Sequence, residues 1–188
     1  MRAVAESVSW RIRGIDRDLS RRGMIMGILN VTPDSFSDGG HFVDHGKAEG
    51  HGLAMVDEGA QIIDVGGEST RPGALPVSLD NELSRVIPVI ERLRKQSDVI
   101  ISIDTMKAEV ARQAVAAGAD IINDVSGLRD PLMLEVAARS GVALIVMHMK
   151  GEPQTMQTNP VYEDVVREVR DFFVAQMQRL QQAGIESS

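Results

Sequence analysis

The sequence predicts an α/β protein whose strands are parallel and buried on both faces. Its 188 residues are 43% hydrophobic but only 3% aromatic, so Val, Ile, Leu, Met and Ala must build the core. Five short apolar runs alternate with helical patterns, as in a chain of repeated β-α units. The runs are nearly continuous in apolar residues, which is typical of strands covered on both sides.

The apolar runs define the expected strands, and polar residues close most of them. We expect strands at Met24–Leu29, Gln61–Val65, Val99–Ile103, Asp120–Asn123 and Ala143–Met147. At or near their carboxyl ends stand Asn30, Asp64, Asp104, Asn123, Asp124 and His148. Active sites of parallel α/β proteins lie at this edge of the sheet, so we expect the functional residues there.

Three helices follow from apolar residues at helical spacing. Ser78 is placed to cap the first, whose apolar positions are Leu79, Leu83, Val86, Ile87 and Ile90. Pro131 suits the first turn of the second. The third has an apolar stripe at Val165, Val166, Val169, Phe172, Phe173, Met177 and Leu180. Gly184 is expected to end it.

The chain divides into a polar, Arg-rich N-terminal lead over residues 1–23 and a β-α domain over residues 24–188. Repeated β-α units imply right-handed crossovers between parallel strands. A closed (β/α)8 barrel has eight units and about 250 residues. The periodicity leaves two architectures open: a smaller open sheet, or such a barrel with only its first five units.

Composition excludes several classes of protein. The chain has 20 basic and 27 acidic residues and a formal net charge of -7, which excludes a general nucleic-acid-binding surface. It has no cysteine, which excludes a disulfide scaffold and a thiolate metal site and favours the cytoplasm. No apolar run reaches the roughly 20 residues of a membrane span. We therefore expect a cytoplasmic protein with small-molecule partners and no membrane or nucleic-acid partner.

The segment from Asn30 to Gly40 is the first candidate site. It combines hydroxyls, carboxylates and an aromatic ring directly after a strand, between Pro33 and two glycines. A polar turn explains this composition equally well. Phe36 favours a ligand-binding loop, because aromatic residues are rare in this chain.

The segment from Asp64 to Gly73 is the second candidate. Its consecutive glycines allow backbone N–H groups to approach a ligand, and Arg71 offers a planar fork for a carboxylate or phosphate. It lacks the Gly-Lys-Ser/Thr of a Walker loop. A structural turn and an anion site remain equally open.

Asp104 and Asn123 form the third candidate set. Both close neighbouring strands, so their side chains are expected over one pocket. A carboxylate and an amide together suit a flat heterocycle with ring N–H donors and ring-nitrogen acceptors. Alternatively, Asp104 caps the helix that begins near Lys107, which does not exclude binding.

Neither a metal site nor a nucleophilic triad is evident from spacing. His41, His45 and His51 lie in or beside a helix start without a metal-site pattern, and His148 stands alone after its strand. No Ser-His-Asp or paired-carboxylate arrangement stands out.

Taken together, these segments resemble the dihydropteroate synthase family, the pterin-binding enzymes of folate biosynthesis. Met26–Gly40 is similar to the family's first signature and Ile63–Gly73 to its second. Three shorter motifs follow in the family's order: Ser102–Thr105, Ile122–Gly127 and Met147–Met149.

The resemblance implies a TIM (β/α)8 barrel fold, with about the first five β-α units in this chain. It implies a reaction that joins p-aminobenzoate to 7,8-dihydropterin-6-ylmethyl diphosphate and releases diphosphate. It implies Mg2+ as cofactor, with Asn30 as a neutral oxygen ligand. For the full-length protein it implies a homodimer, and sulfonamides as mimics of p-aminobenzoate.

Residue roles come from the same resemblance. Asp34 and Arg71 are expected to be catalytic, with Asp34 stabilising positive charge that builds on the pterin methylene. The pterin pocket is expected to include Asp104, Asn123 and Met147. The p-aminobenzoate and diphosphate site is expected to include Thr32, Pro33, Phe36, Thr70, Arg71 and Pro72.

Some family motifs are missing from the sequence given. In the family the sixth and later strands contain an Asp-Pro-Gly, a Ser-Arg-Lys and an Arg-x-His segment that bind pterin and diphosphate. We therefore expect a C-terminally truncated member that is inactive alone. The alternatives are an inactive pterin-binding fragment or regulatory module, and the pterin domain of corrinoid-dependent methyltransferases, which lacks the loop of Thr32 to Gly40.

Overall fold

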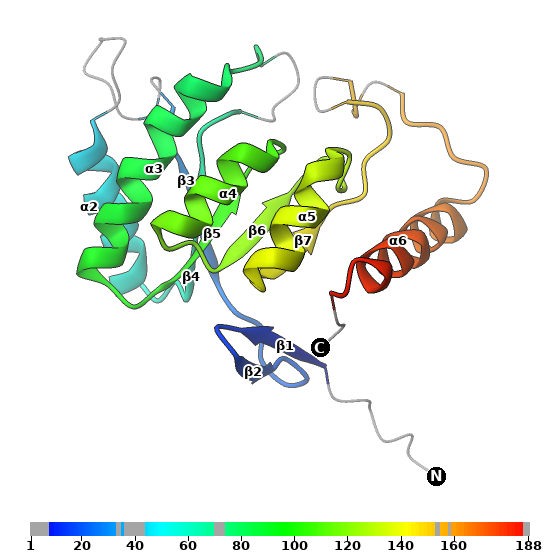
Figure 1. Cartoon of the computed structure of the whole chain (residues 1–188), viewed down its shortest axis with the longest axis horizontal. Coiled ribbons are helices and arrows are strands. Elements are labelled where there is room, and N and C mark those ends of the chain that lie inside the picture. Colours follow the sequence, from blue (N-terminus) through cyan, green and yellow to red (C-terminus); the bar gives the residue numbers. More distant parts are fainter. Residues whose placement is uncertain are drawn as a thin grey trace.

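The computed structural model describes residues 8–32, 35, 44–69, 74–152, 155–157 and 159–185. Its centre is a parallel five-stranded sheet in the order β3-β4-β5-β6-β7, with α2 to α5 along one face (Figure 1). The strands are β3 Met26–Asn30, β4 Ile62–Gly66, β5 Ile100–Asp104, β6 Ile121–Asp124 and β7 Ala143–Val146. The helices are α2 His45–Asp57, α3 Leu79–Gln96, α4 Ala108–Ala117, α5 Pro131–Ser140 and α6 Val165–Gln182.

The predicted strands and helix starts are confirmed with small shifts at the ends. Ser78 caps α3 by accepting a hydrogen bond from Asn81 N, and Pro131 is in the first turn of α5. Gly184, with a φ of +80°, follows the end of α6. Every residue of β4 is buried, as the unbroken apolar pattern predicts.

The two faces of the sheet have different partners. Side chains such as Leu29, Val65 and Ile103 pack with the helices in the larger apolar cluster. The alternate residues Ile62, Ile100 and Ile121 form a second cluster on the inner face, at the amino ends of the strands. Towards the carboxyl ends of the strands the inner-facing residues are polar. The inner face is therefore apolar at one end of the sheet and polar at the other.

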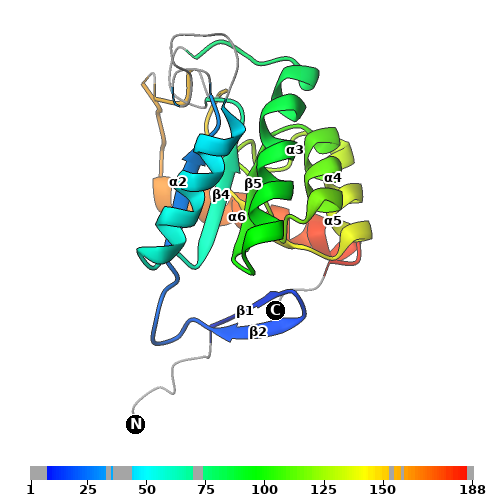
Figure 2. The ribbon, with the colours of Figure 1, turned by 90° about the vertical axis from the view of Figure 1, so that its left-hand side faces the viewer.

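The N-terminal lead contains a hairpin that the sequence reasoning did not predict. Strands β1 Ser9–Ile12 and β2 Ile15–Asp18 pair antiparallel through the two-residue turn Arg13-Gly14. Both turn residues have positive φ, +54° and +69°, as in a tight hairpin turn. Ile12 is fully buried against Ile62, Ile100 and Ile121, so the hairpin covers the amino-terminal end of the sheet (Figure 2).

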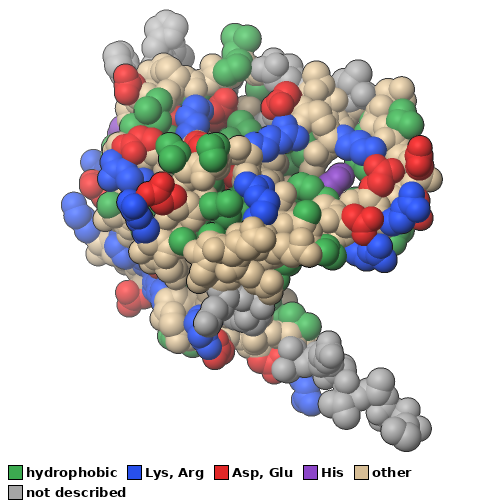
Figure 3. Space-filling view, turned by 45° about the vertical axis from the view of Figure 1, so that its right-hand side comes forward, with side chains coloured by type: hydrophobic (Ala, Val, Ile, Leu, Met, Phe, Trp, Pro, Cys, Tyr) green, Lys and Arg blue, Asp and Glu red, His purple; other side chains and the backbone are tan. Residues whose placement is uncertain are grey.

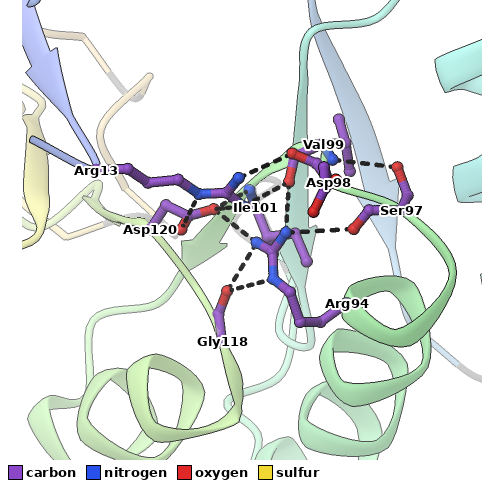
Figure 4. Close-up of polar contacts among 8 residues, drawn as sticks. All are labelled: Arg13, Arg94, Ser97, Asp98, Val99, Ile101, Gly118 and Asp120. Carbon is purple, nitrogen blue, oxygen red and sulfur yellow. Dashed lines mark hydrogen bonds and ion pairs between the residues drawn. The ribbon is translucent and has the colours of Figure 1, made fainter. Parts of the chain in front are cut away.

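Asp120 anchors the hairpin to the sheet (Figure 4). Arg13 donates two hydrogen bonds to its carboxylate, at 2.6 and 2.8 Å, and Arg94 donates a third at 2.7 Å. The same carboxylate accepts a hydrogen bond from Ile101 N at 2.8 Å. One acidic side chain therefore joins the hairpin, α3 and β5.

Helix α6 lies beyond β7, at the opposite end of the sheet from α2 (Figure 1). Phe172 contacts His148 edge-on at a centroid distance of 5.0 Å, and Leu180 packs against the larger cluster. Much of its apolar stripe is exposed, including Val166 at 76%. On the face shown in Figure 3, acidic and basic side chains are interspersed. No helix in the described part of the chain is long and apolar enough to cross a bilayer.

Candidate active site at the carboxyl edge of the sheet

Three of the predicted site residues stand on one row of the sheet. Asn30 pairs in register with Gly66, Gly66 with Asp104, and Asp104 with Asn123. Residues on one row point to the same face, and this face is the inner one. Met147 follows the end of β7 directly, and its N–H donates to Asp124 O at 3.2 Å. The structure thus brings Asn30, Asp104, Asn123 and Met147 to one edge.

A second polar row lies two residues deeper. Asp64 is 6% exposed and pairs in register with Ser102, which is fully buried. Asn123 Nδ2 donates to Asp64 Oδ2 at 3.0 Å. Asp104 Oδ1 is buried without a hydrogen-bond partner among the described residues, and buried Asp64 Oδ1 and Ser102 Oγ have no partner there apart from each other. Unpaired buried oxygens are costly, so this group suits the N–H donors of a bound ligand.

Burial raises the pKa of Asp104 to about 7, and the negative charges of Asp64 and Glu82 add to this effect. Burial also raises the pKa of Asp64, although the Ser102 hydroxyl and the hydrogen bond from Asn123 favour its ionised form. Two carboxyl groups with raised pKa values at one edge are typical of a functional site.

The capping alternative for Asp104 is wrong. The N-cap position of α4 is Lys107, which makes no side-chain capping bond. The first helical N–H, that of Ala108, donates instead to Asp130 Oδ2 at 3.2 Å. Asp104 is therefore free of the helix and faces the inner side of the sheet.

The sequence reasoning noted Asp64 as a polar residue near a strand end and as the first residue of the second candidate segment, but gave neither Asp64 nor Ser102 a role of its own. A signal was available, because residues 64 and 66, like 102 and 104, alternate with apolar residues of the opposite face. The period of two places Asp64 and Ser102 on the side of Asp104.

A buried ionic cluster fixes the loops beside this edge. Lys107 Nζ donates to Glu68 Oε2 and, at 2.5 Å, to Glu82 Oε2, while Thr105 Oγ1 donates to Glu82 Oε1 at 2.6 Å. Glu82 is fully buried. Burial alone would lower the pKa of Lys107, but the hydrogen bonds to the two glutamates outweigh it and the pKa lies above its ordinary value.

The packing of α3 beside this cluster also explains why residue 67, directly after β4, is a glycine. A Cβ on Gly67 would lie 2.8 Å from Val86 Cγ1 and 3.0 Å from Glu82 Cγ, so only glycine fits against α3. Glu68 Oε1 accepts a hydrogen bond from Val77 N at 3.1 Å, which joins the second signature to the segment just before α3.

Asn30 lies beside a cavity of about 380 Å³ lined by Ile28, Asn30, Ser35 and His51. Thr32 is close by, with its Oγ1 2.9 Å from Ser35 Oγ. No cluster of three or more acidic or His ligands occurs among the described residues. A single amide oxygen still fits Mg2+, which often binds one or two protein oxygens together with substrate phosphates and waters.

Several predicted site residues lie outside the described residues: Pro33, Asp34, Phe36, Thr70, Arg71 and Pro72. A further cavity, of about 350 Å³, lies on the outer surface between α4 and α5. Its charged side chains pair with each other, Arg112 with Glu109 and Arg139 with Glu135. It offers none of the unpaired oxygens found at the inner face.

Comparison with known proteins agrees with this geometry. Residues 26–188 match the model of a family described as "Pterin binding enzyme". The chain belongs to this pterin-binding enzyme family.

Among members of this family, the dihydropteroate synthase of Escherichia coli K12 is 52% identical over 173 residues, which are 92% of this chain and 61% of that protein. The Yersinia pestis dihydropteroate synthase in complex with a sulfonamide drug superposes with a TM-score of 0.86 at 47% identity, over 95% of this chain and 65% of that one. The Burkholderia cenocepacia dihydropteroate synthase complexed with 7,8-dihydropteroate superposes with a TM-score of 0.82 at 45% identity. The match covers 96% of this chain and 60% of that one.

Two conclusions follow, one on the fold of this chain and one on how much of its relatives it covers. Its five parallel strands and their helices are part of a (β/α)8 barrel, which decides between the two architectures that periodicity left open. The chain spans about 60% of the length of the curated relatives that it matches.

Proposed function

We propose that the chain binds a 7,8-dihydropterin at its inner face and contributes this site to dihydropteroate synthesis. The proposal rests on the group of buried oxygens of Asp64, Ser102 and Asp104 beside the amide of Asn123, among which Asp104 Oδ1 has no hydrogen-bond partner in the described residues. These acceptors suit the amino and ring N–H groups of an amino-pyrimidine ring. The enzyme from Burkholderia cenocepacia, similar over most of this chain, is described with 7,8-dihydropteroate bound, which supports the assignment.

In the proposed reaction a C–N bond forms between the amine of p-aminobenzoate and the pterin methylene, while the C–O bond to diphosphate breaks and the amine releases one proton to the solvent. Asp104, Asn123 and Met147 hold the pterin. Asp34 stabilises positive charge on the methylene, and Arg71 contacts diphosphate. The remaining contacts to p-aminobenzoate and diphosphate are assigned to Thr32, Pro33, Phe36, Thr70 and Pro72. The amine needs positioning and a dry pocket more than a strong base.

Asn30 is the proposed protein ligand of Mg2+. Its place on the same row as Asp104, at the carboxyl edge of the sheet, supports this assignment. When bound, the metal would stabilise negative charge on the leaving diphosphate. For the full-length protein we propose a homodimer, and for this chain, without cysteine, a place in the cytoplasm.

Calorimetry with a 6-hydroxymethyl-7,8-dihydropterin tests the pterin site. Asp104→Ala and Asn123→Ala should each weaken binding about 10- to 150-fold, because a lost charged or buried hydrogen bond costs about 1.5–3 kcal/mol. Glu135→Ala, on the exposed outer surface of α5, is the control and should bind as the unchanged chain does.

Chromatographic assay of dihydropteroate with p-aminobenzoate and the pterin diphosphate completes the test. Binding with product formation supports a synthase, whereas binding without product supports the alternative of a pterin-binding module. The proposed site would be contradicted if the unchanged chain bound no pterin, or if both variants bound it with the affinity of the unchanged chain.

A further inference from the structure

Thr105 directly follows Asp104 at the end of β5 and joins three other elements. It is 3% exposed. Its N–H donates a hydrogen bond to Asn123 O at 3.1 Å, and its Oγ1 donates to Glu82 Oε1 at 2.6 Å. The same hydroxyl oxygen accepts a hydrogen bond from Lys107 N at 3.2 Å. Thr105 therefore connects the end of β5 with β6, with α3 and with the start of α4.

The carboxylate of Asp104 depends on the backbone for its position. Its Oδ1 is buried without a hydrogen-bond partner among the described residues. Asp104 pairs in register with Asn123, and the bond from Thr105 N to Asn123 O lies directly beyond this pair. How firmly this bond holds the two strand ends therefore sets how firmly the two side chains are held relative to each other.

A buried carboxylate fixes the hydroxyl of Thr105. Glu82 is fully buried, and its second oxygen accepts a hydrogen bond from Lys107 Nζ at 2.5 Å. Burying such an ion pair has a desolvation cost that apolar side chains of similar volume would avoid. The carboxylate supplies direction instead, because a short hydrogen bond from a hydroxyl to a charged oxygen is strong and geometrically specific. Helix α3 thereby supports the turn that follows Asp104.

We propose that Thr105 is a positioning residue of the pterin site, whose hydroxyl, held by Glu82, keeps the Asp104 carboxylate and the Asn123 amide at the spacing that the ligand requires. The inference rests on the proposed function and adds a residue that acts through the two pterin-binding residues. Groups that are already in place bind more tightly, since the ligand does not have to order them. Loss of the hydroxyl should therefore weaken binding, although no group that touches the ligand is removed.

Two variants isolate the hydroxyl. Thr105→Ser and Thr105→Ala both lack the methyl group and differ only in the hydroxyl that reaches Glu82. We expect calorimetry with 6-hydroxymethyl-7,8-dihydropterin to give Thr105→Ser an affinity within about threefold of that of the unchanged chain. Thr105→Ala should bind about tenfold more weakly or worse, because the buried hydrogen bond to a charged group is lost.

Val89→Ala is the control for a general loss of stability. Val89 is fully buried on α3, about two turns beyond Glu82. Removing its methyl groups should lower the melting temperature without changing the turn at Thr105. Well below the melting temperature of each variant, Val89→Ala should bind the pterin as the unchanged chain does. Equal weakening of binding in Val89→Ala and Thr105→Ala would reduce Thr105 to a structural role and overturn the inference.

Hydrogen exchange tests the hydroxyl without a ligand. After correction for intrinsic rates, the amide of residue 105 should exchange about tenfold faster or more in Thr105→Ala than in Thr105→Ser, with β4 unchanged. Thr105→Val also lacks the hydroxyl and gives the comparison if Thr105→Ala fails to fold. Equal exchange at residue 105, or equal pterin affinity, with and without the hydroxyl would overturn the inference. An unchanged chain that binds no pterin, with the expected order of exchange rates, would instead contradict the proposed function and support the anchoring of this turn by the hydroxyl.

Discussion

Asp104 shows how the surroundings of a single residue change its ionisation. Its carboxyl group is mostly buried, and four acidic neighbours, Asp64, Glu82, Asp124 and Glu68, add negative potential. Both effects disfavour the ionised form, so the group titrates at about pH 7 in the folded chain. A group that titrates this close to neutral pH makes both stability and binding depend on pH.

We predict that ionisation of Asp104 lowers the free energy of unfolding as the pH rises. Its folded pKa of about 7 lies above its ordinary value of 3.8, so the stabilising contribution is complete below about pH 4 and is lost as the pH rises through 7. Between pH 5 and pH 8 the free energy of unfolding should fall by about 2–3 kcal/mol from this group. Urea unfolding of the unchanged chain and Asp104→Asn at both pH values measures it. Identical pH dependence in the two proteins would count against the assignment.

At the scale of elements, the ionic cluster joins parts that are distant in sequence. Glu68 follows β4, Glu82 is in α3, and Lys107 precedes α4. Two glutamates on one lysine, with Thr105 on the buried glutamate, satisfy most of the charge that burial isolates. The cluster thereby fixes the loops that follow β4 and β5, next to Asp104.

Lys107→Met should therefore destabilise the chain by about 3–5 kcal/mol, because it leaves the buried Glu82 and the partly buried Glu68 without a cation. Lys47→Met is a suitable control, since Lys47 is an exposed lysine 3.9 Å from Asp44, and exposed pairs contribute about 0–1 kcal/mol. Chemical denaturation of both variants gives the comparison. If Lys107→Met unfolds at the same midpoint as Lys47→Met, the cluster does not stabilise these loops.

At the scale of the whole molecule, the hairpin covers the amino ends of the strands while the site occupies the carboxyl ends. Arg13 adopts a positive φ of +54°, which costs free energy for a residue with a side chain. Its guanidinium group offsets this cost through the Asp120 carboxylate and through the carbonyl oxygens of Asp98 and Val99, at 2.9 and 3.0 Å (Figure 4). The apolar contact of Ile12 completes the docking.

Arg13→Ala should loosen the hairpin while the sheet stays folded. The loss should be about 1–2 kcal/mol, since Arg13 is 31% exposed and water screens part of its ion pair. Hydrogen exchange of the amides from residue 9 to residue 18 should accelerate at least several-fold, with little change in β4 and β5. Arg112→Ala, which removes an exposed pair on α4, should leave hairpin exchange unchanged. Equal hairpin exchange in both variants would show that Arg13 does not anchor it.

The sequence by itself determined the β-α order, the N-cap at Ser78, the place of Pro131 in the first turn of α5, and the edge of the sheet that bears the candidate site. These follow from local signals, because apolar periodicity and capping residues act over a few neighbours. The meeting of Asn30, Asp104 and Asn123 on one row was predictable from the order of the strands, since the carboxyl ends of parallel strands lie at one edge of the sheet. Their roles in catalysis come from the family resemblance and remain predictions.

Only the tertiary structure decided which polar residues touch. The amide of Asn123 reaches Asp64 across an intervening strand, and Lys107 meets glutamates 39 and 25 residues away. The same holds for the hairpin, where Ile12 is buried within a polar segment and Arg13 reaches Asp120, 107 residues further along. Such contacts depend on register and on the packing of distant elements, which local patterns do not specify. The sequence therefore predicts where the site lies, and the packing of distant strands decides how its polar groups are oriented.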